Sequence, residues 1–386
     1  MKNQRIQKIK NKYTSTFNHE PLLIASPGRI NLIGEHVDYN GGWVLPAAID
    51  KYIYMAIEKA NTSTCTAIAL DVEEQIVFDL NEIEPIAQGG WQNYILGVVG
   101  ELQKRGKKVA PFNLVFSGDI PMGAGLSSSA ALENGIALGL NQLFDFQLSK
   151  KEMIAIAQKA EHNYVGVQCG IMDQFASMMG SEKNALLLDC QSLDYEPVPL
   201  DLGNYTLLLL NTNVSHSLAD SAYNERRATC ERAVTKLQKK DANIQSLRDV
   251  ITWDFKQIKS LLSPLEWKRA AYVIEEILRV EKAQKALEQR NFDAFGALLF
   301  QSHDGLQNAY EVSCAELDFL VLCAKENPAI KGARMMGGGF GGCTINFIHQ
   351  DAVDLFVKET AIAYQNQFNK ALTAYAVRLA NGTHLI

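Results

Sequence analysis

The sequence predicts an α plus β fold of two domains, with a boundary near residue 200. Strand-like and helix-like patterns alternate along the whole chain. Its 386 residues exceed what one ordinary core accommodates. Hydrophobic residues make up 47% and charged residues 21%, as in globular proteins. We therefore expect residues 1–200 to form an N-terminal domain and residues 201–386 a C-terminal one.

In the first half, segments rich in β-branched and aromatic residues predict strands, and apolar residues at helical spacing predict helices. The basic start, residues 1–12, is expected to be a solvated helix or tail. Strands are expected at 22–25 (ending at Ser26-Pro27-Gly28), 43–48, 52–58, 65–70, 75–79, 113–116 and 185–189. Helices are expected at 91–105, at 129–144 and from residue 150, where Ser149 and Glu152 form a capping box.

The second half has fewer strand patterns and longer helical ones. Strands are expected at 205–210 and 343–348, and charged amphipathic helices at 219–240 and 267–289. A Gly-rich loop precedes the strand that begins at Cys343.

Composition excludes several classes of protein. The net charge is −6 and no long Lys/Arg block occurs, so we expect no nucleic-acid partner. The seven cysteines form no CxxC pair, which argues against a disulfide framework or a structural zinc site and fits a reducing cytoplasm. The N-terminus has no apolar signal region, and the apolar run at 205–210 is too short to span a bilayer. We expect a cytoplasmic protein without a membrane partner.

A Gly-rich segment from Gly118 to Ala130 lies between a predicted strand and helix. Small residues let backbone N–H groups approach a ligand, and the helix N-terminus adds partial positive charge, so the segment suits a phosphate. No Gly-Lys-Ser/Thr follows the glycines, which excludes a Walker A loop. The serines offer helix capping and a hydroxyl for Mg²⁺. The ligand-binding core of this segment is expected to be Gly123, Ala124, Gly125, Leu126, Ser127, Ser128 and Ser129.

Two further segments are rich in glycine. Pro27 to Gly42 brings Arg, Glu, His and Asp side chains together, which suits recognition of several sugar hydroxyls, although a salt-bridged surface loop is the alternative. Met335 to Cys343 has five glycines around Phe340. Such backbone is expected to press against a ligand or another loop, unless it is only a turn.

In this order, the three segments resemble those of the GHMP kinase superfamily, and GRINLIGEHVDY (Gly28 to Tyr39) resembles the signature of its galactokinase branch. The resemblance extends from Pro27 to Asn346. It implies an N-terminal domain like ribosomal protein S5, a ferredoxin-like C-terminal α/β domain, and an active site in the cleft between them. It also implies Mg²⁺- and ATP-dependent phosphorylation of the anomeric hydroxyl of galactose, giving galactose 1-phosphate and ADP.

The resemblance assigns roles to individual residues. Asp173 resembles the catalytic base, and Arg29 resembles the partner that keeps this carboxylate ionised and stabilises developing charge. Val37 stands where a Thr is common, and its side chain is expected to point away from its polar neighbours. The implied substrate-binding set is Glu35, His36, Val37, Asp38, Gly170 and Tyr223.

For the nucleotide, residues 123–129 are expected to wrap the phosphates. Trp91 and Tyr94 resemble the segment near the adenine, although aromatic residues are more often helix core. Ser129 and Glu161 resemble the Mg²⁺ ligands, with Ser128 as the alternative to Ser129.

Three alternatives to a galactose kinase remain open. A non-catalytic galactose sensor is disfavoured by the intact Ser128-Ser129-Ala130-Ala131 stretch together with Arg29 and Asp173. A mevalonate kinase is disfavoured by Gly34 to Tyr39. A kinase for N-acetylgalactosamine would need a larger pocket near the sugar 2-position. For a galactose kinase we expect only small-molecule partners, galactose and ATP. We also expect a monomer.

Overall fold

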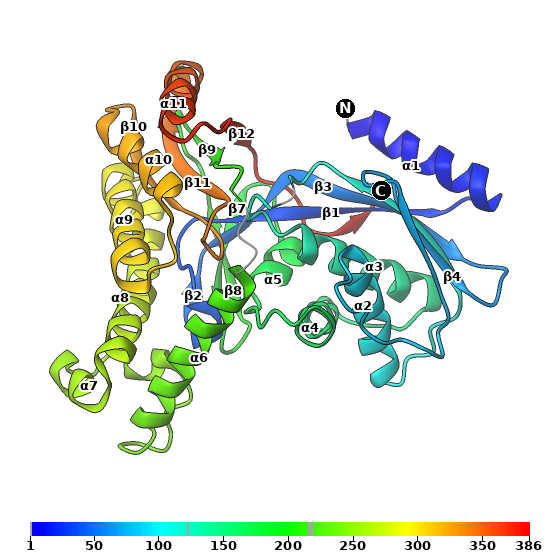
Figure 1. Ribbon diagram of the computed structural model, residues 1–386, viewed down its shortest axis with the longest axis horizontal. Helices are drawn as coiled ribbons and strands as arrows, with labels where there is room; N and C mark the ends of the chain where they lie inside the picture. The colour runs from blue at the N-terminus through cyan, green and yellow to red at the C-terminus, as the bar shows by residue number, and fades with distance from the viewer. Residues whose placement is uncertain (1, 122, 215–218) are drawn as a thin grey trace.

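The computed structural model describes residues 2–121, 123–214 and 219–386, and the strands in these ranges form three sheets (Figure 1). The largest sheet has six strands, which are antiparallel to their neighbours except that β4 runs parallel to β6. Its strands, in spatial order, are β13 (His384–Leu385), β1 (Leu22–Asn31), β3 (Pro46–Lys59), β6 (Phe112–Gly118), β4 (Cys65–Ala69) and β5 (Glu74–Phe78).

The second sheet is antiparallel and has four strands, and the third is a three-stranded sheet beside the first. The four-stranded sheet consists of β10 (Ile330–Met335), β11 (Cys343–His349), β9 (Tyr205–Asn211) and β12 (Thr373–Val377). The three-stranded sheet consists of β2 (Trp43–Val44), β7 (Asn184–Asp189) and β8 (Tyr195–Pro199). The predicted α plus β class is confirmed.

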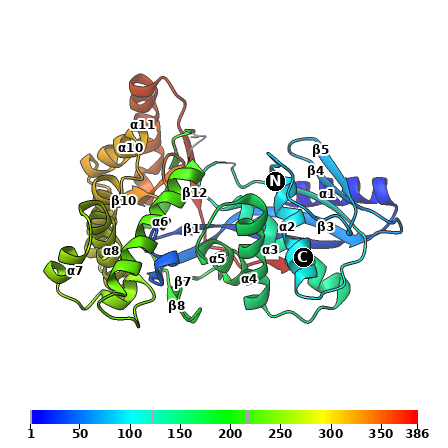
Figure 2. The ribbon, with the colours of Figure 1, turned by 60° about the horizontal axis from the view of Figure 1, so that its bottom comes forward.

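Helices α2 to α5 gather on one face of the six-stranded sheet, and α1 packs on the other (Figures 1 and 2). Their bounds are α1 (Lys2–Phe17), α2 (Trp91–Lys104), α3 (Ser128–Phe144), α4 (Lys150–Ala160) and α5 (Met172–Met179). The predicted capping box is present, because the Ser149 side chain accepts from the Glu152 N–H and the Glu152 carboxylate accepts from the Ser149 N–H. A π-helical turn, η2 (Glu161–Val165), follows α4.

The helices of the second half pack around the four-stranded sheet and on one another (Figure 1). They are α6 (Ala219–Leu237), α7 (Phe255–Leu261), α8 (Pro264–Glu288), α9 (Phe292–Gly305), α10 (Ala315–Glu326) and α11 (Val353–Phe368). Short helical turns complete the chain: η1 (Asp38–Asn40), η3 (Leu247–Val250), η4 (Leu306–Tyr310) and η5 (Gln350–Ala352). None of the helices in the described ranges combines the length and apolarity needed to cross a membrane.

The prediction that the first strand ends at Gly28 is wrong. Strand β1 continues to Asn31, with a register shift against β3 between Pro27 and Arg29. Gly28 sits at this shift because a Cβ atom there would lie 2.7 Å from the Leu126 carbonyl oxygen. The irregularity re-aims the following side chain, that of Arg29, as β-bulges commonly do near active sites.

The separate strands predicted at 43–48 and 52–58 are also wrong. Strand β2 has two residues, whereas β3 runs without interruption from Pro46 to Lys59. The polar pair Asp50-Lys51 lies between the two predicted strands. Pairing with β1 on one side and β6 on the other carries the backbone through it.

The two ends of the chain meet the six-stranded sheet in ways the sequence did not indicate. Helix α1 forms, but it is not simply solvated, because Ile9 and Tyr13 are buried against the sheet. Strand β13 pairs with β1, so the last residues of the predicted C-terminal domain return to the N-terminal sheet.

We predict that Ile9→Ala lowers the free energy of unfolding by about 2–5 kcal/mol, because it removes a fully buried side chain. Chemical denaturation followed by circular dichroism measures the change. The exposed neighbour Lys8 gives the control, since Lys8→Ala should shift stability by no more than about 0.5 kcal/mol. Equal effects of the two substitutions would contradict the packing of α1.

Candidate active site

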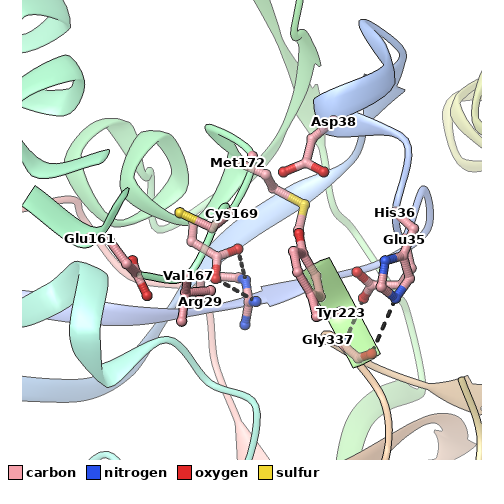
Figure 3. Close-up of a pocket in the computed structure, with 13 residues that line it drawn as sticks. Arg29, Glu35, His36, Asp38, Glu161, Val167, Cys169, Met172, Tyr223 and Gly337 are labelled. Atoms are coloured by element: carbon pink, nitrogen blue, oxygen red, sulfur yellow. Dashed lines mark hydrogen bonds and ion pairs between the residues drawn. The ribbon is translucent and has the colours of Figure 1, made fainter. Parts of the chain in front are cut away.

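A cavity of about 120 Å³ lies where both halves of the chain meet (Figure 3). Its walls come from β1 and the loop after it, from η2 and α5, from α6, and from the Gly-rich loop after β10. Glu161 lies at one end of the cavity, and Glu35 and His36 lie at the other. The lining residues are Arg29, Glu35, His36, Asp38, Glu161, Val167, Cys169, Gly170, Met172, Asp173, Tyr223, Gly337 and Gly338.

Arg29 and Asp173 form a two-point ion pair in this cavity. Arg29 Nε donates to Asp173 Oδ1 and Nη2 donates to Oδ2, both at 2.8 Å. The remaining guanidinium nitrogen, Nη1, donates to the Gly125 carbonyl at 2.5 Å. Burial alone would lower the pKa of Arg29, but the charges of Asp173 and Glu35 raise the pKa above its ordinary value. The guanidinium is therefore a permanent cation.

The start of helix α3 is not capped by the side chain that precedes it. Ser127 is the residue before the helix, with φ of 57°, but its side chain makes no capping hydrogen bond. Its hydroxyl instead donates to Asp173 Oδ2, so the predicted capping role is wrong for Ser127. Gly123 and Gly125 also have left-handed backbone, whereas Met122 lies outside the described residues. First-turn N–H groups without a side-chain cap, next to such a loop, suit an anion.

Glu35 and His36 are held by the Gly-rich loop from the second half. The Gly337 N–H donates to Glu35 Oε1 at 2.8 Å. His36 Nε2 lies 3.1 Å from the Gly338 carbonyl, and Nδ1 lies 2.8 Å from the hydroxyl of Tyr39. Burial lowers the pKa of His36 to about 3, so the ring is neutral, with Nε2 donating to Gly338 and Nδ1 accepting from Tyr39.

Asp38 is a buried carboxyl group that packs against Gly170. Burial, and then the charge of Asp173, raises the pKa of Asp38 to about 7. The Tyr39 N–H donates to its Oδ1 at 2.9 Å. A Cβ atom at Gly170 would lie 1.7 Å from Asp38 Oδ2, so only glycine fits there. Gly170 lines the cavity, and its lack of a side chain leaves room for the Asp38 carboxyl group.

Two other predicted substrate contacts differ from each other. Tyr223, on α6, lines the cavity, with its ring centroid 5.2 Å from that of His36. Val37 does not line it, because the side chain is fully buried in the hydrophobic core. Its inclusion in the substrate-binding set is therefore not supported, although the expected direction of its side chain is.

A second, more apolar cavity of about 550 Å³ lies beside the start of α3. Trp91 and Tyr94 line it, as do Ser128 and Ser129. The Trp91 ring packs edge-on to Phe116, and its Nε1 donates to Glu74 at 2.7 Å. The complete lining is Ile53, Ala69, Asp71, Val72, Gly90, Trp91, Tyr94, Phe116, Gly118, Ile120, Ser128, Ser129 and Leu132. Flat aromatic walls suit a planar ring system.

Glu161 lines the small cavity and Ser129 lines the larger one, and the two side chains contact each other. Burial, and then the charge of Asp173, raises the pKa of Glu161 to about 7, whereas a hydrogen bond with Ser129 lowers it. This bond favours Ser129 over Ser128 as the partner of Glu161. One hydroxyl and one carboxylate fit Mg²⁺ that takes its other ligands from phosphates and water. Among the described residues, no group of three or more His, Cys, Asp or Glu side chains could hold a metal ion by itself.

Several residues near these cavities were not found from the sequence. Gln174 Nε2 donates to Glu161 Oε2 at 2.8 Å and to Glu133 Oε2 at 3.2 Å. Glu133 lies one helical turn after Ser129, a spacing that could have indicated it. Arg334 is fully buried beside Glu35, and no pattern in the sequence distinguishes it from a surface arginine.

The chain matches three family models. Residues 93–181 match the GHMP kinases N terminal domain, residues 283–365 match the GHMP kinases C terminal domain, and residues 11–59 match the galactokinase galactose-binding signature. Two curated relatives span essentially the whole chain. A galactokinase of Thermotoga neapolitana is 42% identical and covers 95% of this chain and 100% of its own. A galactokinase of Clostridium tetani is 39% identical, covering 100% and 98%.

Solved structures show the same likeness. The crystal structure of Lactococcus lactis galactokinase complexed with galactose has a TM-score of 0.94 and 36% identity, covering 99% of this chain and 100% of its own. The structure of Methanococcus jannaschii mevalonate kinase has a TM-score of 0.65 at 20% identity, covering 94% of this chain and 99% of its own. The latter likeness concerns the fold alone.

We predict that Asp38→Asn stabilises the protein at pH 8 but not at pH 4. A carboxyl whose pKa is raised from 3.8 to about 7 by folding contributes stability below pH 3.8, and this is lost as the pH rises through 7. Asparagine removes the charge, so the variant should gain on the order of 2–4 kcal/mol over the parent at pH 8. Thermal unfolding of both proteins across this pH range measures the difference. A difference independent of pH would contradict burial of the charged form.

Proposed function

The chain belongs to the galactokinase family of the GHMP kinases, and from this premise we propose that it transfers the γ-phosphate of ATP to the anomeric hydroxyl of galactose. The products are galactose 1-phosphate and ADP, which is the first phosphorylation step of galactose catabolism. The observation that carries the proposal is a pair of unlike cavities linked by one side-chain contact. Glu161 lines the small charged cavity that contains Arg29 and Asp173, and it contacts Ser129, which lines the larger apolar cavity.

The small cavity suits a single hexose. Its volume of about 120 Å³ leaves room for on the order of ten water-sized groups. Carboxylates of Glu35 and Asp38 face it as acceptors for hydroxyl groups, with Tyr223 and the backbone at Gly170 beside them. Such a site rejects a wrong epimer because a mismatched hydroxyl leaves buried polar groups unpaired.

In the proposed reaction, Asp173 accepts the proton of the anomeric hydroxyl. The O–H bond breaks, the sugar oxygen forms a bond to the γ-phosphorus, and the bond from that phosphorus to the bridging oxygen of ADP breaks. Arg29 and Ser127 hold the Asp173 carboxylate in place through three hydrogen bonds. Because these donors also stabilise the carboxylate, Asp173 either accepts the proton late in the phosphoryl transfer or mainly orients the hydroxyl.

The larger cavity suits the nucleotide. Trp91 and Tyr94 would flank the adenine, and the backbone from Gly123 to Ser129 with the start of α3 would hold the phosphates. Ser129 and Glu161 would hold Mg²⁺. When bound, this ion neutralises charge on the phosphates.

Three broader features belong to the same proposal. The chain acts as a monomer in the cytoplasm, with no nucleic-acid or membrane partner. Residues 1–200 supply most of the sugar and nucleotide contacts, and residues 201–386 supply Tyr223 and the Gly-rich loop.

The decisive assay measures ADP release with Mg-ATP and galactose, glucose, N-acetylgalactosamine or mevalonate. We expect turnover on galactose and little on glucose, because the site contacts individual hydroxyls. Turnover chiefly on N-acetylgalactosamine would change the assigned substrate but leave the proposed mechanism intact. Galactose binding measured by calorimetry, without turnover, would show a non-catalytic sensor instead of a kinase.

We predict that Asp173→Asn lowers kcat by about 10²- to 10⁴-fold, the loss typical of a missing general base. The amide cannot accept the proton, although it can still lie beside Arg29. Binding of a non-hydrolysable ATP analogue, measured by calorimetry, should change by less than about threefold and serves as the control for folding. Turnover equal to that of the parent would refute the role of Asp173.

A further inference from the structure

We propose that Arg334 is a positioning residue for sugar recognition, which orients the carboxylate of Glu35 so that one of its oxygens is presented to a sugar hydroxyl. This inference rests on the proposed function and deepens it. Arg334 belongs to β10, in the second half of the chain, whereas Glu35 follows β1 in the first half. The pair therefore crosses between the two halves.

The guanidinium of Arg334 is fixed by main-chain contacts that do not involve Glu35. Its Nε donates to the Leu32 carbonyl at 2.8 Å, and Nη1 donates to the Met335 carbonyl at 2.6 Å. Nη2 donates to the Asn31 carbonyl. The side chain has no solvent exposure and is the largest fully buried side chain in the described residues. These contacts within the protein fix the orientation of the guanidinium without help from a ligand.

All the hydrogen bonds that the Glu35 carboxylate receives within the described residues fall on one oxygen. Nη1 and Nη2 of Arg334 both lie 3.2 Å from Glu35 Oε1, and the Gly337 N–H donates to the same atom at 2.8 Å. The other oxygen, Oε2, remains for a donor from the cavity that Glu35 lines (Figure 3). A sugar hydroxyl is such a donor.

Arginine is needed here because of its geometry. A planar fork can hold three carbonyl groups and a carboxylate at once, whereas the ammonium of lysine has three donors on a flexible stem. Glu35 has 3% of its side chain exposed, so without Arg334 its charge would be buried with little compensation. Loss of Arg334 should therefore weaken recognition of the one hydroxyl that Glu35 contacts more than recognition of the other sugar hydroxyls.

The test measures kcat and KM for galactose and for its 2-, 3-, 4- and 6-deoxy analogues. The penalty of a deoxy analogue is the fold-loss in its kcat/KM relative to galactose. The analogue whose penalty disappears in Glu35→Gln identifies the hydroxyl bound by Glu35. We expect Arg334→Lys to reduce that same penalty from on the order of 10- to 100-fold to less than about threefold. The other penalties and the KM for ATP should stay within about threefold of the parent.

Arg279 offers a matched control in the same region. It is a buried arginine whose partner, Glu276, accepts from the Gly34 N–H at 3.0 Å and from Ser302 at 2.7 Å. This pair supports the same loop but does not touch the Glu35 carboxylate. Arg279→Lys should lower the melting temperature and leave the pattern of deoxy penalties as in the parent.

A second variant keeps the test decisive if Arg334→Lys does not fold. Arg334→Met combined with Glu35→Gln removes both charges, which avoids an uncompensated buried carboxylate. If Arg334 acts through Glu35, adding Arg334→Met to Glu35→Gln should change the KM for galactose by less than about threefold.

The proposal is overturned if Arg334→Lys keeps the parent's penalty pattern, if it reduces all penalties alike, or if the losses in the double variant multiply. Failure of the proposed function is recognised separately, because the parent itself would then show no turnover on galactose. In that case the same comparison is made by calorimetric binding of galactose and its deoxy analogues. Absence of binding to the parent would overturn both proposals.

Discussion

The two-point ion pair between Arg29 and Asp173 is the contact on which the site depends. It joins the irregular end of β1 to the first turn of α5, and through Gly125 and Ser127 it also fixes the loop before α3. Removing two charges from water is costly unless hydrogen bonds satisfy them, and here four hydrogen bonds to the guanidinium and the carboxylate do so in fixed geometry. On the proposed mechanism, the carboxylate that accepts the substrate proton is therefore in place before the substrate binds.

The second half of the chain closes the site by backbone contacts. The Gly-rich loop donates from Gly337 to Glu35 and accepts from His36 at Gly338. Met336, at the start of this loop, approaches so closely that a Cβ atom at Gly125 would lie 3.3 Å from the Met336 carbonyl oxygen. The expectation that this loop presses against another loop is confirmed. Gly337 lies against Gly125 from the other side, since a Cβ atom there would lie 3.4 Å from the Gly125 carbonyl oxygen, and both glycines have left-handed backbone.

The enclosed cavity also leaves charges that the protein alone does not neutralise. Burial raises the pKa values of Asp38 and Glu161 to about 7, and each raised value expresses a cost of keeping the carboxylate ionised. A ligand that brings hydroxyl donors or a cation lowers this cost. Carboxylates placed for ligand binding therefore reduce the folding stability of the protein, as is common for functional sites.

The sequence by itself determined the α plus β class, most elements and the three Gly-rich motifs, since hydrophobic periodicity and dense polar residues among glycines are local signals. Asp173, Glu161 and Tyr223 lie outside those motifs and were predicted only through the resemblance to galactokinases. The tertiary structure alone decided the path of β1 through Pro27, the burial of Val37, the bond from Ser127 to Asp173, and the place of Arg334. Each of these depends on partners far away in the chain. Contacts over such separations leave no periodic trace, because the energy of burying a charge or packing a side chain is fixed only when its distant neighbours are known.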